Sequence, residues 1–596
     1  MDRYLQILRT FWGYDDFRGI QRDIIESIGR GEDTLGLMPT GGGKSITFQV
    51  PTMAMDGLCL VISPLISLMQ DQVANLRKLG IRAASINMSM GHEEVLTVLE
   101  SCIFGGYKFL YVSPERLSSD LFQNKLSRMK VCLIAIDEAH CISQWGYDFR
   151  PAYLEISKVR ELLPGVPVLA LTATATPLVV EDIQRQLSFA RQNVFRMSFD
   201  RKNLVYVVRN TENMDKEMTN ILKATTGSAI VYCQSRATTV DVAATLTNED
   251  ISATHYHAGL AHEQRVLRQR EWTQGKTRVM VATNAFGMGI DKADVRVVIH
   301  YGMPQSIEAY YQEAGRAGRD GDTSYAVLLY MDATKRKLRK LVSSSFPVRE
   351  VIGSVYEHIC CFFELAVNDG QDYTRMFDMD KFCVAFRHYP HTVSAVLHLL
   401  ELSGYIAVES SPDRYSRFMF MLTRNQLYRL DRLSGQGERI LNLMMRTYVG
   451  LFTDMQNINE KFIAEQTGLT VDEVYMFLKD LASRNIAQYV PLRNLPVIRF
   501  TRRRVDTERL IIPEEVYEKR RDAMKERIEA MIGYAEHKGC RSRFMLDYFG
   551  EKMEDDCMHC DMCKRGGASQ GGIKKAVQAL LDNGKALLHG SVSSKE

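Results

Sequence analysis

Residues 38–45 read Met-Pro-Thr-Gly-Gly-Gly-Lys-Ser and follow the short apolar run Thr34-Leu-Gly-Leu. The three consecutive glycines let backbone N–H groups curl around a phosphate without a side-chain clash. Lys44 can meet the β and γ phosphates of a nucleotide, and Ser45 can offer its hydroxyl to Mg²⁺. The competing interpretation is a glycine-rich turn without function, but a strand, this loop and a helix in succession favour nucleotide binding. The predicted nucleotide-binding residues of the loop are Thr40, Gly41, Gly42, Gly43, Lys44 and Ser45.

A second element of the same site follows the apolar run Val-Cys-Leu-Ile-Ala-Ile, which ends in Asp137-Glu138-Ala139-His140. An acidic pair at the end of a buried strand suits metal–phosphate chemistry. We expect Asp137 to hold Mg²⁺ and Glu138 to polarise the water that attacks the γ-phosphate. Alone, such a pair is often a helix cap. Together with the glycine-rich loop it predicts a centre that hydrolyses ATP.

Two further groups extend this site. Tyr14, Arg18 and Gln21 precede the loop, and a glutamine near an aromatic ring can read the edge of adenine and stack on its face. The later stretch that begins at Gln312 supplies Arg316 and Arg319. These arginines lie too far along the chain to share the first domain, so we expect ATP to be clamped between two domains, with Arg319 as an arginine finger.

The first 342 residues alternate short β-branched runs with amphipathic segments, which is typical of parallel α/β folds. Loops at the carboxyl ends of such strands bind ligands. We place one domain at 1–205 and a second at 206–342. The expected strands are Leu-Cys-Leu-Val-Ile-Ser, Lys-Phe-Leu-Tyr-Val-Ser, Val-Cys-Leu-Ile-Ala-Ile-Asp, Pro-Val-Leu-Ala-Leu-Thr-Ala, Ser-Ala-Ile-Val-Tyr-Cys, Thr-Arg-Val-Met-Val-Ala-Thr and Val-Arg-Val-Val-Ile-His.

With these motifs in this order, residues from about 5 to 340 resemble the RecQ family of superfamily 2 DNA helicases. The most specific piece is Ser143-Gln-Trp-Gly-Tyr-Asp-Phe-Arg-Pro151, directly after the acidic pair. It is similar to the family's aromatic-rich loop, which senses single-stranded DNA and relays its binding to the ATPase centre. Aromatic rings and Arg150 give stacking and cation–π surfaces that accept any base. A core Trp and Phe in a turn are the alternative. The expected DNA-binding residues here are Gln144, Trp145, Phe149 and Arg150.

The resemblance implies two RecA-like motor domains that move 3′ to 5′ on single-stranded DNA. It also implies that Arg236 and His257 grip DNA and that Gly289 and Asp291 help to finish the nucleotide site. One position departs from the family, which more often holds His where this chain has Tyr147. Tyrosine stacks and hydrogen-bonds but is not a cation near neutral pH, so the coupling between DNA and ATP is expected to be retuned.

Beyond residue 342 the pattern changes to helices followed by strand pairs, which predicts winged helices. Helices near 382–386 and 391–404 precede strands at 405–409 and 417–422, which we expect to form one wing. A similar order recurs more faintly up to residue 501. We therefore expect two winged-helix-like units in tandem, at 343–430 and 431–510. The second would carry a basic wing for duplex DNA, unless its arginines form a solvated or packing face: Arg493, Arg499, Arg502, Arg503 and Arg504.

Four of the 12 cysteines gather near the end of the chain, at Cys540, Cys557, Cys560 and Cys563. Four thiolates give a closed tetrahedral zinc site, which is structural because no position remains for water. His559 is a weaker rival ligand. We expect a zinc-binding module at 511–566, similar to that of the family, and a linker and tail at 567–596. The winged units precede this module here, whereas in the family a winged helix usually follows it.

Composition adds little to this interpretation. The net charge of +3 is nearly neutral for 596 residues, so any DNA surface must be local. No apolar run is long enough to cross a membrane, and we expect a cytoplasmic, nucleoid-associated protein without membrane partners. Expected partners are single-stranded and duplex DNA in repair or recombination, and protein partners are unknown. An RNA helicase and a DNA-binding regulator with a vestigial ATPase are the alternatives.

Overall fold

The computed structural model of the chain describes residues 2–566, except residue 40 and segments 88–89, 288–291, 410–415, 423–434, 449, 485 and 492–495. The chain divides into two compact units, one made of residues 1–342 and 519–596 and the other of residues 343–518. Among the residues discussed above, Thr40, Gly289, Asp291, Arg493 and the expected tail from residue 567 lie outside the described residues. No helix in the described part of the chain is long and apolar enough to span a membrane.

The first domain of the larger unit is built on a seven-stranded parallel sheet in the order β3-β4-β2-β5-β6-β1-β7. Its strands are β1 (Thr34–Leu37), β2 (Leu58–Ile62), β3 (Ala83–Ile86), β4 (Phe109–Val112), β5 (Val131–Ile136), β6 (Val168–Thr172) and β7 (Val194–Arg196). Its α-helices are α1 (Arg3–Trp12), α2 (Gln21–Gly29), α3 (Lys44–Ala54), α4 (Ile66–Lys78), α5 (His92–Ile103), α6 (Asp120–Leu126), α7 (Glu155–Leu162) and α8 (Pro177–Gln186), with 3-10 turns η1 (Pro114–Arg116), η2 (Ala139–Ile142) and η3 (Pro151–Leu154). Separate apolar clusters pack on the two faces of the sheet, which explains the continuous apolar strands.

The second domain has a six-stranded parallel sheet in the order β10-β11-β9-β12-β13-β8. Its strands are β8 (Leu204–Asn210), β9 (Ser228–Cys233), β10 (Ala253–Tyr256), β11 (Val279–Ala282), β12 (Val295–Tyr301) and β13 (Ser324–Tyr330), and its helices are α9 (Met214–Ala224), α10 (Arg236–Asn248), α11 (His262–Thr273), α12 (Ile307–Ala314) and α13 (Asp332–Ser345). All seven strand runs expected from the sequence form strands in these two sheets, which confirms the parallel α/β fold.

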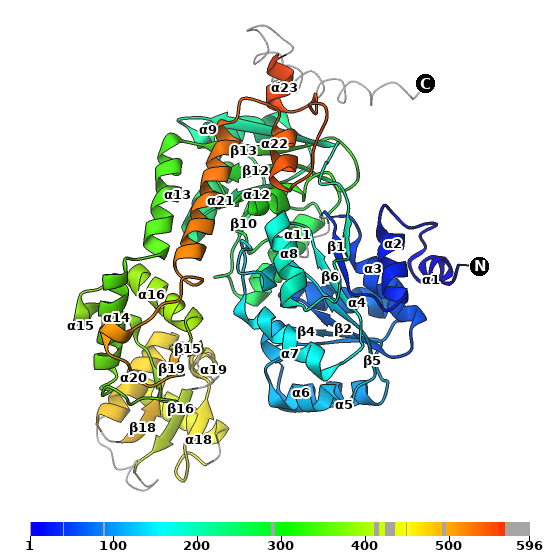
Figure 1. Ribbon diagram of the computed structural model, residues 1–596. Coiled ribbons are helices and arrows are strands. Elements are labelled where there is room, and N and C mark those ends of the chain that lie inside the picture. The colour runs from blue at the N-terminus through cyan, green and yellow to red at the C-terminus, as the bar shows by residue number, and fades with distance from the viewer. Residues whose placement is uncertain are drawn as a thin grey trace, which may run out of the picture. The chain divides into compact units, whose positions relative to one another are not determined.

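The cysteine-bearing segment packs on the second domain. It contains α21 (Glu518–Glu536), α22 (Arg541–Tyr548) and α23 (Asp561–Gly566), and Figure 1 shows α21 and α22 beside the helices of that domain. The ring of Phe549 stacks on Phe199 with centroids 4.6 Å apart. A carboxylate oxygen of Asp561 accepts the Val208 N–H at 3.2 Å. Since β8 is the edge strand of its sheet, this contact covers a backbone donor that would otherwise face outward.

The smaller unit contains two three-stranded sheets, in the orders β14-β19-β15 and β17-β16-β18. Its strands are β14 (Thr374–Met376), β15 (Ile406–Glu409), β16 (Ser416–Phe420), β17 (Gln456–Ile458), β18 (Ala487–Val490) and β19 (Val497–Phe500). Its helices are α14 (Arg349–Phe362), α15 (Met379–Phe386), α16 (Pro390–Leu402), α18 (Gly435–Thr447), α19 (Glu460–Thr467) and α20 (Val471–Ser483), with a 3-10 turn η4 (Thr507–Arg509). The helices and strands expected for two winged-helix units are therefore present.

The predicted tandem arrangement of the two winged units is wrong. β15 does not pair with β16 but forms an antiparallel pair with β19, in which Ile406 faces Phe500 and Glu409 faces Val497. β16 pairs with β17 and β18. The second winged unit, residues 416–491, is thus inserted between the two wing strands of the first. Periodicity shows that a segment is a strand but not which strand it pairs with, and a loop tip tolerates an inserted domain because its two ends lie close together.

Each winged unit has its own apolar core. One core contains Phe418, Ile440 and Leu478 of the inserted unit, and the other contains Phe382 and Ile498 of the outer unit. The separation of the cores supports the nested arrangement, because each set of strands and helices buries its own apolar side chains.

Those arginines of the expected basic wing that lie among the described residues follow or form β19 and belong to the outer unit. Arg499 lies on β19, 3.8 Å from Asp372. The guanidinium of Arg502 lies over the Tyr405 ring, 5.3 Å from its centroid. Arg504 donates a hydrogen bond to the Leu365 carbonyl. These three side chains therefore contact neighbours within their own unit, and their binding to duplex DNA stays a prediction.

The nested arrangement predicts that the inserted unit can be removed cleanly. Replacing residues 410–496 with Asn-Gly should join β15 to β19 in a two-residue hairpin, because Glu409 and Val497 already face each other. The shortened chain should stay folded and unfold cooperatively in thermal melts followed by circular dichroism. The matched deletion of residues 423–496 keeps β16 but removes both strands with which it pairs, and should aggregate. Aggregation of the Asn-Gly chain would contradict the nested fold.

Candidate functional site

A cavity of about 370 Å³ lies at the carboxyl ends of the first domain's strands. This volume falls within the range typical of ligand pockets. The first domain contributes the glycine-rich loop and the acidic pair, and the second domain contributes part of α12 and the turn after it. The predicted site residues that line the cavity are Tyr14, Arg18, Gln21, Gly41, Gly43, Lys44, Ser45, Asp137, Glu138, Gln312, Arg316 and Arg319. The structure thus gathers residues that the sequence places far apart.

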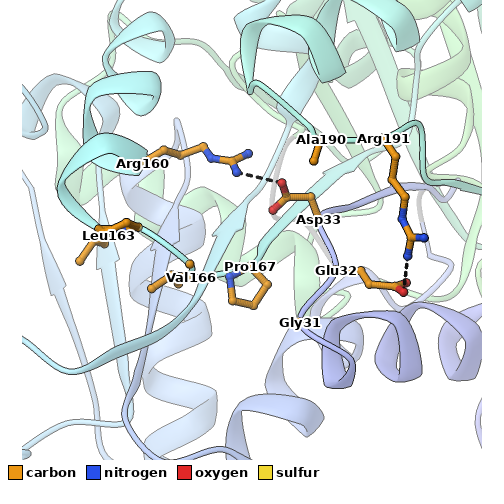
Figure 2. Close-up of a pocket in the computed structure, with 11 residues that line it drawn as sticks. Gly31, Glu32, Asp33, Arg160, Leu163, Val166, Pro167, Ala190 and Arg191 are labelled. Carbon is orange, nitrogen blue, oxygen red and sulfur yellow. Dashed lines mark hydrogen bonds and ion pairs between the residues drawn. The ribbon is translucent and has the colours of Figure 1, made fainter.

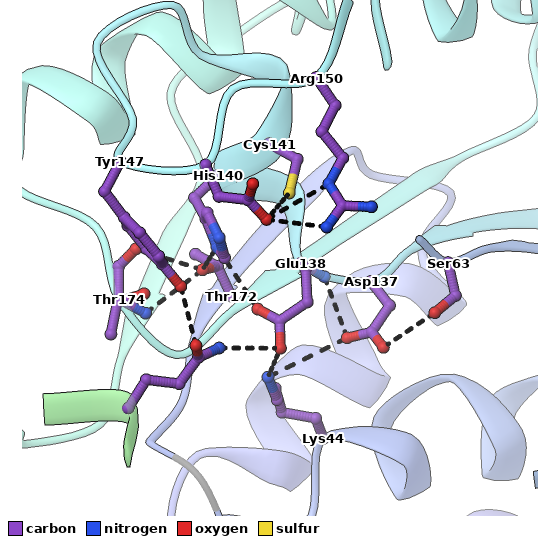
Figure 3. Close-up of polar contacts among 12 residues, drawn as sticks. Lys44, Ser63, Asp137, Glu138, His140, Cys141, Tyr147, Arg150, Thr172 and Thr174 are labelled. Atoms are coloured by element: carbon purple, nitrogen blue, oxygen red, sulfur yellow. Dashed lines mark hydrogen bonds and ion pairs between the residues drawn. The ribbon is translucent and has the colours of Figure 1, made fainter. Parts of the chain in front are cut away.

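The two carboxylates face one cation (Figure 3). The Lys44 ammonium lies 3.5 Å from a carboxylate oxygen of Glu138 and 4.0 Å from one of Asp137. Burial raises the pKa of Asp137 to about 6, although Lys44 opposes the shift. Burial also disfavours the charged form of Glu138, but the charge of Lys44 and its hydrogen bond outweigh burial and lower the pKa of Glu138. Glu138 is therefore ionised near neutral pH, as a group that accepts a proton from water must be.

Glu138 has a strained backbone. Its φ of 48° and ψ of 48° are left-handed, at the junction between β5 and the turn η2. For a residue with a side chain this conformation costs about 1 kcal/mol or more. Surrounding contacts hold it in place: Tyr153 donates its hydroxyl to the Asp137 carbonyl at 2.9 Å, and the Glu138 N–H donates to its neighbour's carboxylate at 3.0 Å. The strain directs the carboxylate toward the phosphate-binding loop.

The glycine-rich loop is stabilised from behind by Gln21. The Gln21 amide donates to the carbonyls of Gly42 and Gly43 at 3.2 and 3.1 Å and accepts the Arg18 N–H at 2.9 Å. Gly43 has a φ of 77°, and a Cβ added there would lie 2.3 Å from the Gln21 nitrogen. The side chain expected to read adenine therefore contacts the loop backbone in this structure. Tyr14 stays about half exposed, with the Arg18 guanidinium 5.6 Å from its ring centroid.

The second domain completes the cavity. The Gln312 amide lies 3.5 Å from a Glu138 carboxylate oxygen. Arg316 is buried and donates to the Gly287 carbonyl. The Cγ atom of Arg319 lies 3.6 Å from the position that a Cβ on Gly41 would occupy, so the arginine passes directly over the phosphate-binding loop. This arrangement suits residues that stabilise negative charge on a γ-phosphate held between two domains.

The aromatic-rich loop, residues 143–150, joins the turns η2 and η3 directly after Glu138. Trp145 is half buried against the first domain's core, and Arg150 is held by the Asp148 carboxylate at 3.0 Å and the Pro64 carbonyl at 3.4 Å. Tyr147 stacks on His140 with centroids 4.8 Å apart. Its hydroxyl donates to the Gln312 side-chain oxygen at 2.9 Å. One loop residue therefore connects the expected DNA sensor to the second motor domain.

The other expected DNA-binding residues lie on the second domain. Arg236 begins α10 and is exposed, and its Nη1 lies 3.1 Å from the position that a Cβ on Gly259 would occupy. His257 follows β10 and stacks on His255 with centroids 5.6 Å apart. Burial, followed by the charge of Arg236, lowers the pKa of His257. These residues form a group separate in sequence from the aromatic-rich loop, and their binding to DNA stays a prediction.

A second cavity of about 430 Å³ lies at the opposite edge of the first sheet, before β1 and β6 (Figure 2). Its charged side chains pair with each other: Arg160 with Asp33 at 2.8 Å, and Arg191 with Glu32. Ligands of parallel α/β sheets bind at the carboxyl ends of the strands, whereas this cavity lies at the amino ends. Its paired charges support a structural role.

The four cysteines form a metal site as expected. Their sulfur atoms lie within 4.8 Å of one another, with the Cys563 sulfur 3.8 Å from that of Cys557 and 3.4 Å from that of Cys560. Tetrahedral zinc with Zn–S bonds near 2.3 Å places sulfur atoms about 3.8 Å apart. The N–H of Cys557 also points to the Cys540 sulfur at 3.3 Å. The group fits one zinc ion held by four thiolates, and His559 is not part of it.

Some contacts of this site could not have been found in the sequence. Tyr147 stood out only as a departure from a family pattern, and nothing in the pattern indicated Gln312 as its partner. Two arginines of α21, Arg520 and Arg527, contact the aromatic-rich loop although almost four hundred positions separate them from it. Neither lies in a recognisable motif, so no sequence signal was available.

Comparisons with known families agree with this arrangement. Residues 18–183 match the DEAD/DEAH box helicase family and residues 212–321 the helicase conserved C-terminal domain. Residues 418–491 match the RecQ helicase winged-helix domain of Bacteroidota, and residues 501–564 match the RecQ zinc-binding family. The winged-helix match coincides with the inserted unit defined by strand pairing.

Individual relatives match over the motor region. The chain is 44% identical over 339 residues to the ATP-dependent DNA helicase RecQ of Haemophilus influenzae, which covers 57% of this chain and 55% of that protein. It is 42% identical over 334 residues to the probable ATP-dependent DNA helicase RecS of Bacillus subtilis, covering 55% of this chain and 67% of that protein. A putative ATP-dependent RNA helicase of Acanthamoeba polyphaga mimivirus is 44% identical, covering 54% of this chain and 60% of that protein. The chain thus spans little more than half the length of the first of these relatives.

The Tyr147 hydroxyl is expected to support DNA-stimulated ATP hydrolysis through its bond to Gln312. Tyr147→Phe should lower DNA-stimulated ATP hydrolysis by roughly five- to tenfold, the effect of one lost hydrogen bond. Burial raises the pKa of Tyr147 well above its usual range, so the hydroxyl keeps its proton between about pH 6 and 9. The pH profiles of the two proteins should therefore differ in height but not in shape. A titration step present in the wild type and missing from Tyr147→Phe would contradict this role, and Tyr107→Phe is the control.

Zinc should stabilise more than its own module, because that module covers the edge strand β8. Cys560→Ser should reduce the bound zinc measured by elemental analysis from one ion per chain to a small fraction of that. It should also lower the melting temperature of the motor, since metal binding contributes folding free energy. Cys361→Ser changes an exposed cysteine outside the cluster and serves as the control. Full retention of zinc in Cys560→Ser would contradict the four-cysteine site. An unchanged melting temperature after zinc loss would contradict the stabilisation of the motor by zinc.

Proposed function

The chain belongs to the RecQ family of helicases, and from this premise we propose that it is an ATP-dependent DNA helicase. We propose that it moves 3′ to 5′ on single-stranded DNA and unwinds duplex DNA in repair or recombination. The observation that carries the proposal is the continuous set of contacts from the aromatic-rich loop to the catalytic carboxylate. Tyr147 binds Gln312, whose amide in turn lies against Glu138. An ATPase without a nucleic-acid partner has no need of such a connection.

The residues divide the chemistry of hydrolysis among themselves. Lys44 and the loop N–H groups are placed to bind the phosphates, and Ser45 and Asp137 to hold Mg²⁺, which neutralises phosphate charge when bound. Ionised Glu138 is placed to orient water and accept its proton. Arg316 and Arg319 approach from the second domain, so charge that develops on the γ-phosphate is stabilised only when the two domains enclose the nucleotide. Hydrolysis is thereby linked to domain movement.

DNA is the favoured nucleic acid because the RecQ and RecS relatives are DNA helicases, and the aromatic-rich loop offers rings on which bases can stack beside the catalytic pair. Thr40, Gly289 and Asp291 lie outside the described residues and remain proposed contributors to nucleotide binding. We also propose that Gln144, Trp145, Phe149 and Arg150 bind the strand on the first domain, with Arg236 and His257 on the second. Action on DNA would place the protein at the nucleoid.

Strand polarity tests the proposed function directly. With ATP and Mg²⁺, a duplex that carries a 3′ single-stranded tail should be unwound, whereas the same duplex with a 5′ tail should not. Single-stranded DNA should stimulate ATP hydrolysis more than blunt duplex or RNA of equal length. Equal or greater stimulation by RNA would favour an RNA helicase. An ATPase that no nucleic acid stimulates would favour the DNA-binding regulator with a vestigial motor.

A further inference from the structure

Helix α21 presents two arginines to the aromatic-rich loop. Arg520 and Arg527 are about two helical turns apart and so lie on the same face of α21. The guanidinium of Arg520 lies over the Phe149 ring, 4.9 Å from its centroid. Arg527 donates from Nη1 to the Trp145 carbonyl at 2.8 Å and to the Gly146 carbonyl at 3.4 Å. The helix thus holds both the backbone and one ring of the loop.

The charges of these arginines are poorly compensated. In the described part of the chain, no carboxylate oxygen within 4.0 Å pairs with either guanidinium. Burial lowers the pKa of Arg520 to about 10, and the nearby charge of Arg527 contributes to the shift. Two half-buried like charges without a paired carboxylate attract any phosphate chain that can reach them. The contacts of the two arginines with the loop therefore suit the DNA-free protein, and a DNA strand can displace them.

The ring under Arg520 has a competing use. A base can stack on the face of Phe149 that Arg520 covers only if the guanidinium moves off it, because both need the same π surface. The phosphates of the same strand offer each arginine an anionic partner, which the neutral carbonyls and the ring of the loop do not provide. DNA binding and the contacts of α21 with the loop therefore oppose each other.

The same loop reaches the ATPase centre. Tyr147 lies two positions after Trp145 and holds the oxygen of Gln312, while the Gln312 nitrogen faces Glu138. With Arg527 and Arg520 in place, the loop cannot move without breaking contacts at both ends. The position of Gln312 beside the catalytic carboxylate is thereby fixed in the absence of DNA.

We propose that Arg520 and Arg527 act as a latch that holds the aromatic-rich loop in a resting arrangement, and that single-stranded DNA stimulates ATP hydrolysis by releasing it. The proposal rests on the proposed function, in which this loop senses DNA. Both arginines are positioning residues: they act on the ATPase centre through the loop and do not touch the nucleotide. Helix α21 therefore belongs to the regulation of the motor as well as to the zinc-bearing segment.

Arg527→Met keeps the aliphatic stem and removes the donors, and Arg520→Met does the same for the cation over Phe149. In the full chain without DNA, either variant should raise ATP hydrolysis by about three- to tenfold, the shift expected from one lost hydrogen bond. Hydrogen–deuterium exchange of the amides in residues 143–150 should become faster in the same samples. With saturating oligo-dT the rate should match that of the wild type. Arg527→Lys retains a charge and a donor. Its DNA-free rate of ATP hydrolysis should lie between the rates of the wild type and of Arg527→Met.

Arg521→Met is the matched control, because Arg521 neighbours the latch but pairs with Asp522 at 2.9 Å. It should leave both the DNA-free rate and the exchange of the loop unchanged. A latch variant with wild-type exchange and a wild-type or lower DNA-free rate would overturn the proposal. If the wild-type ATPase itself failed to respond to oligo-dT, the proposed function would fail first, and the two failures are thereby distinguished.

Discussion

The buried carboxylate pair at the end of β5 is the constraint on which the motor depends. Asp137 and Glu138 lie at the edge where the carboxyl ends of the parallel strands meet. Burial disfavours the charged form of both carboxylates. Lys44 provides the compensating cation, and the glycine-rich loop that carries it must therefore lie opposite the pair. The left-handed backbone of Glu138 and the hydroxyl of Tyr153 fix that geometry. The second domain then approaches the same point through Gln312 and the two arginines after α12.

The parts added to this motor act through contacts with it. The zinc-bearing segment covers the edge strand β8 through Asp561 and stacks Phe549 on the connection between the two sheets. The helix α21 of the same segment contacts the aromatic-rich loop. A module whose metal site is structural thus also carries residues that restrain the loop beside the catalytic centre. The nested winged units have their own cores, and their nesting keeps the outer wing strands paired around a whole inserted domain.

The sequence predicted the motor well because its signals are local. A pattern of a few residues is enough to recognise the loop at 38–45, the acidic pair and the apolar strands. The spacing of Cys557, Cys560 and Cys563 likewise indicates a metal site directly. What could not be predicted depends on partners distant in sequence. The pairing of β15 with β19 leaves no trace in the periodicity of either strand. Likewise, nothing in the sequence around Arg527 indicates its contact with Trp145. The sequence placed Gln21 at the nucleotide site but did not predict its hydrogen bonds to the loop backbone.

We propose that ATP hydrolysis needs both motor domains at one nucleotide. The most direct test of this proposal is Arg319→Ala, measured for nucleotide affinity with a fluorescent ATP analogue and for single-turnover hydrolysis in the presence of single-stranded DNA. Arg319 lies over the phosphate-binding loop but belongs to the second domain. Affinity should stay near that of the wild type, while hydrolysis should fall by about a thousandfold or more, the usual effect of a lost arginine finger. Hydrolysis at the wild-type rate would contradict a nucleotide site shared by the two domains.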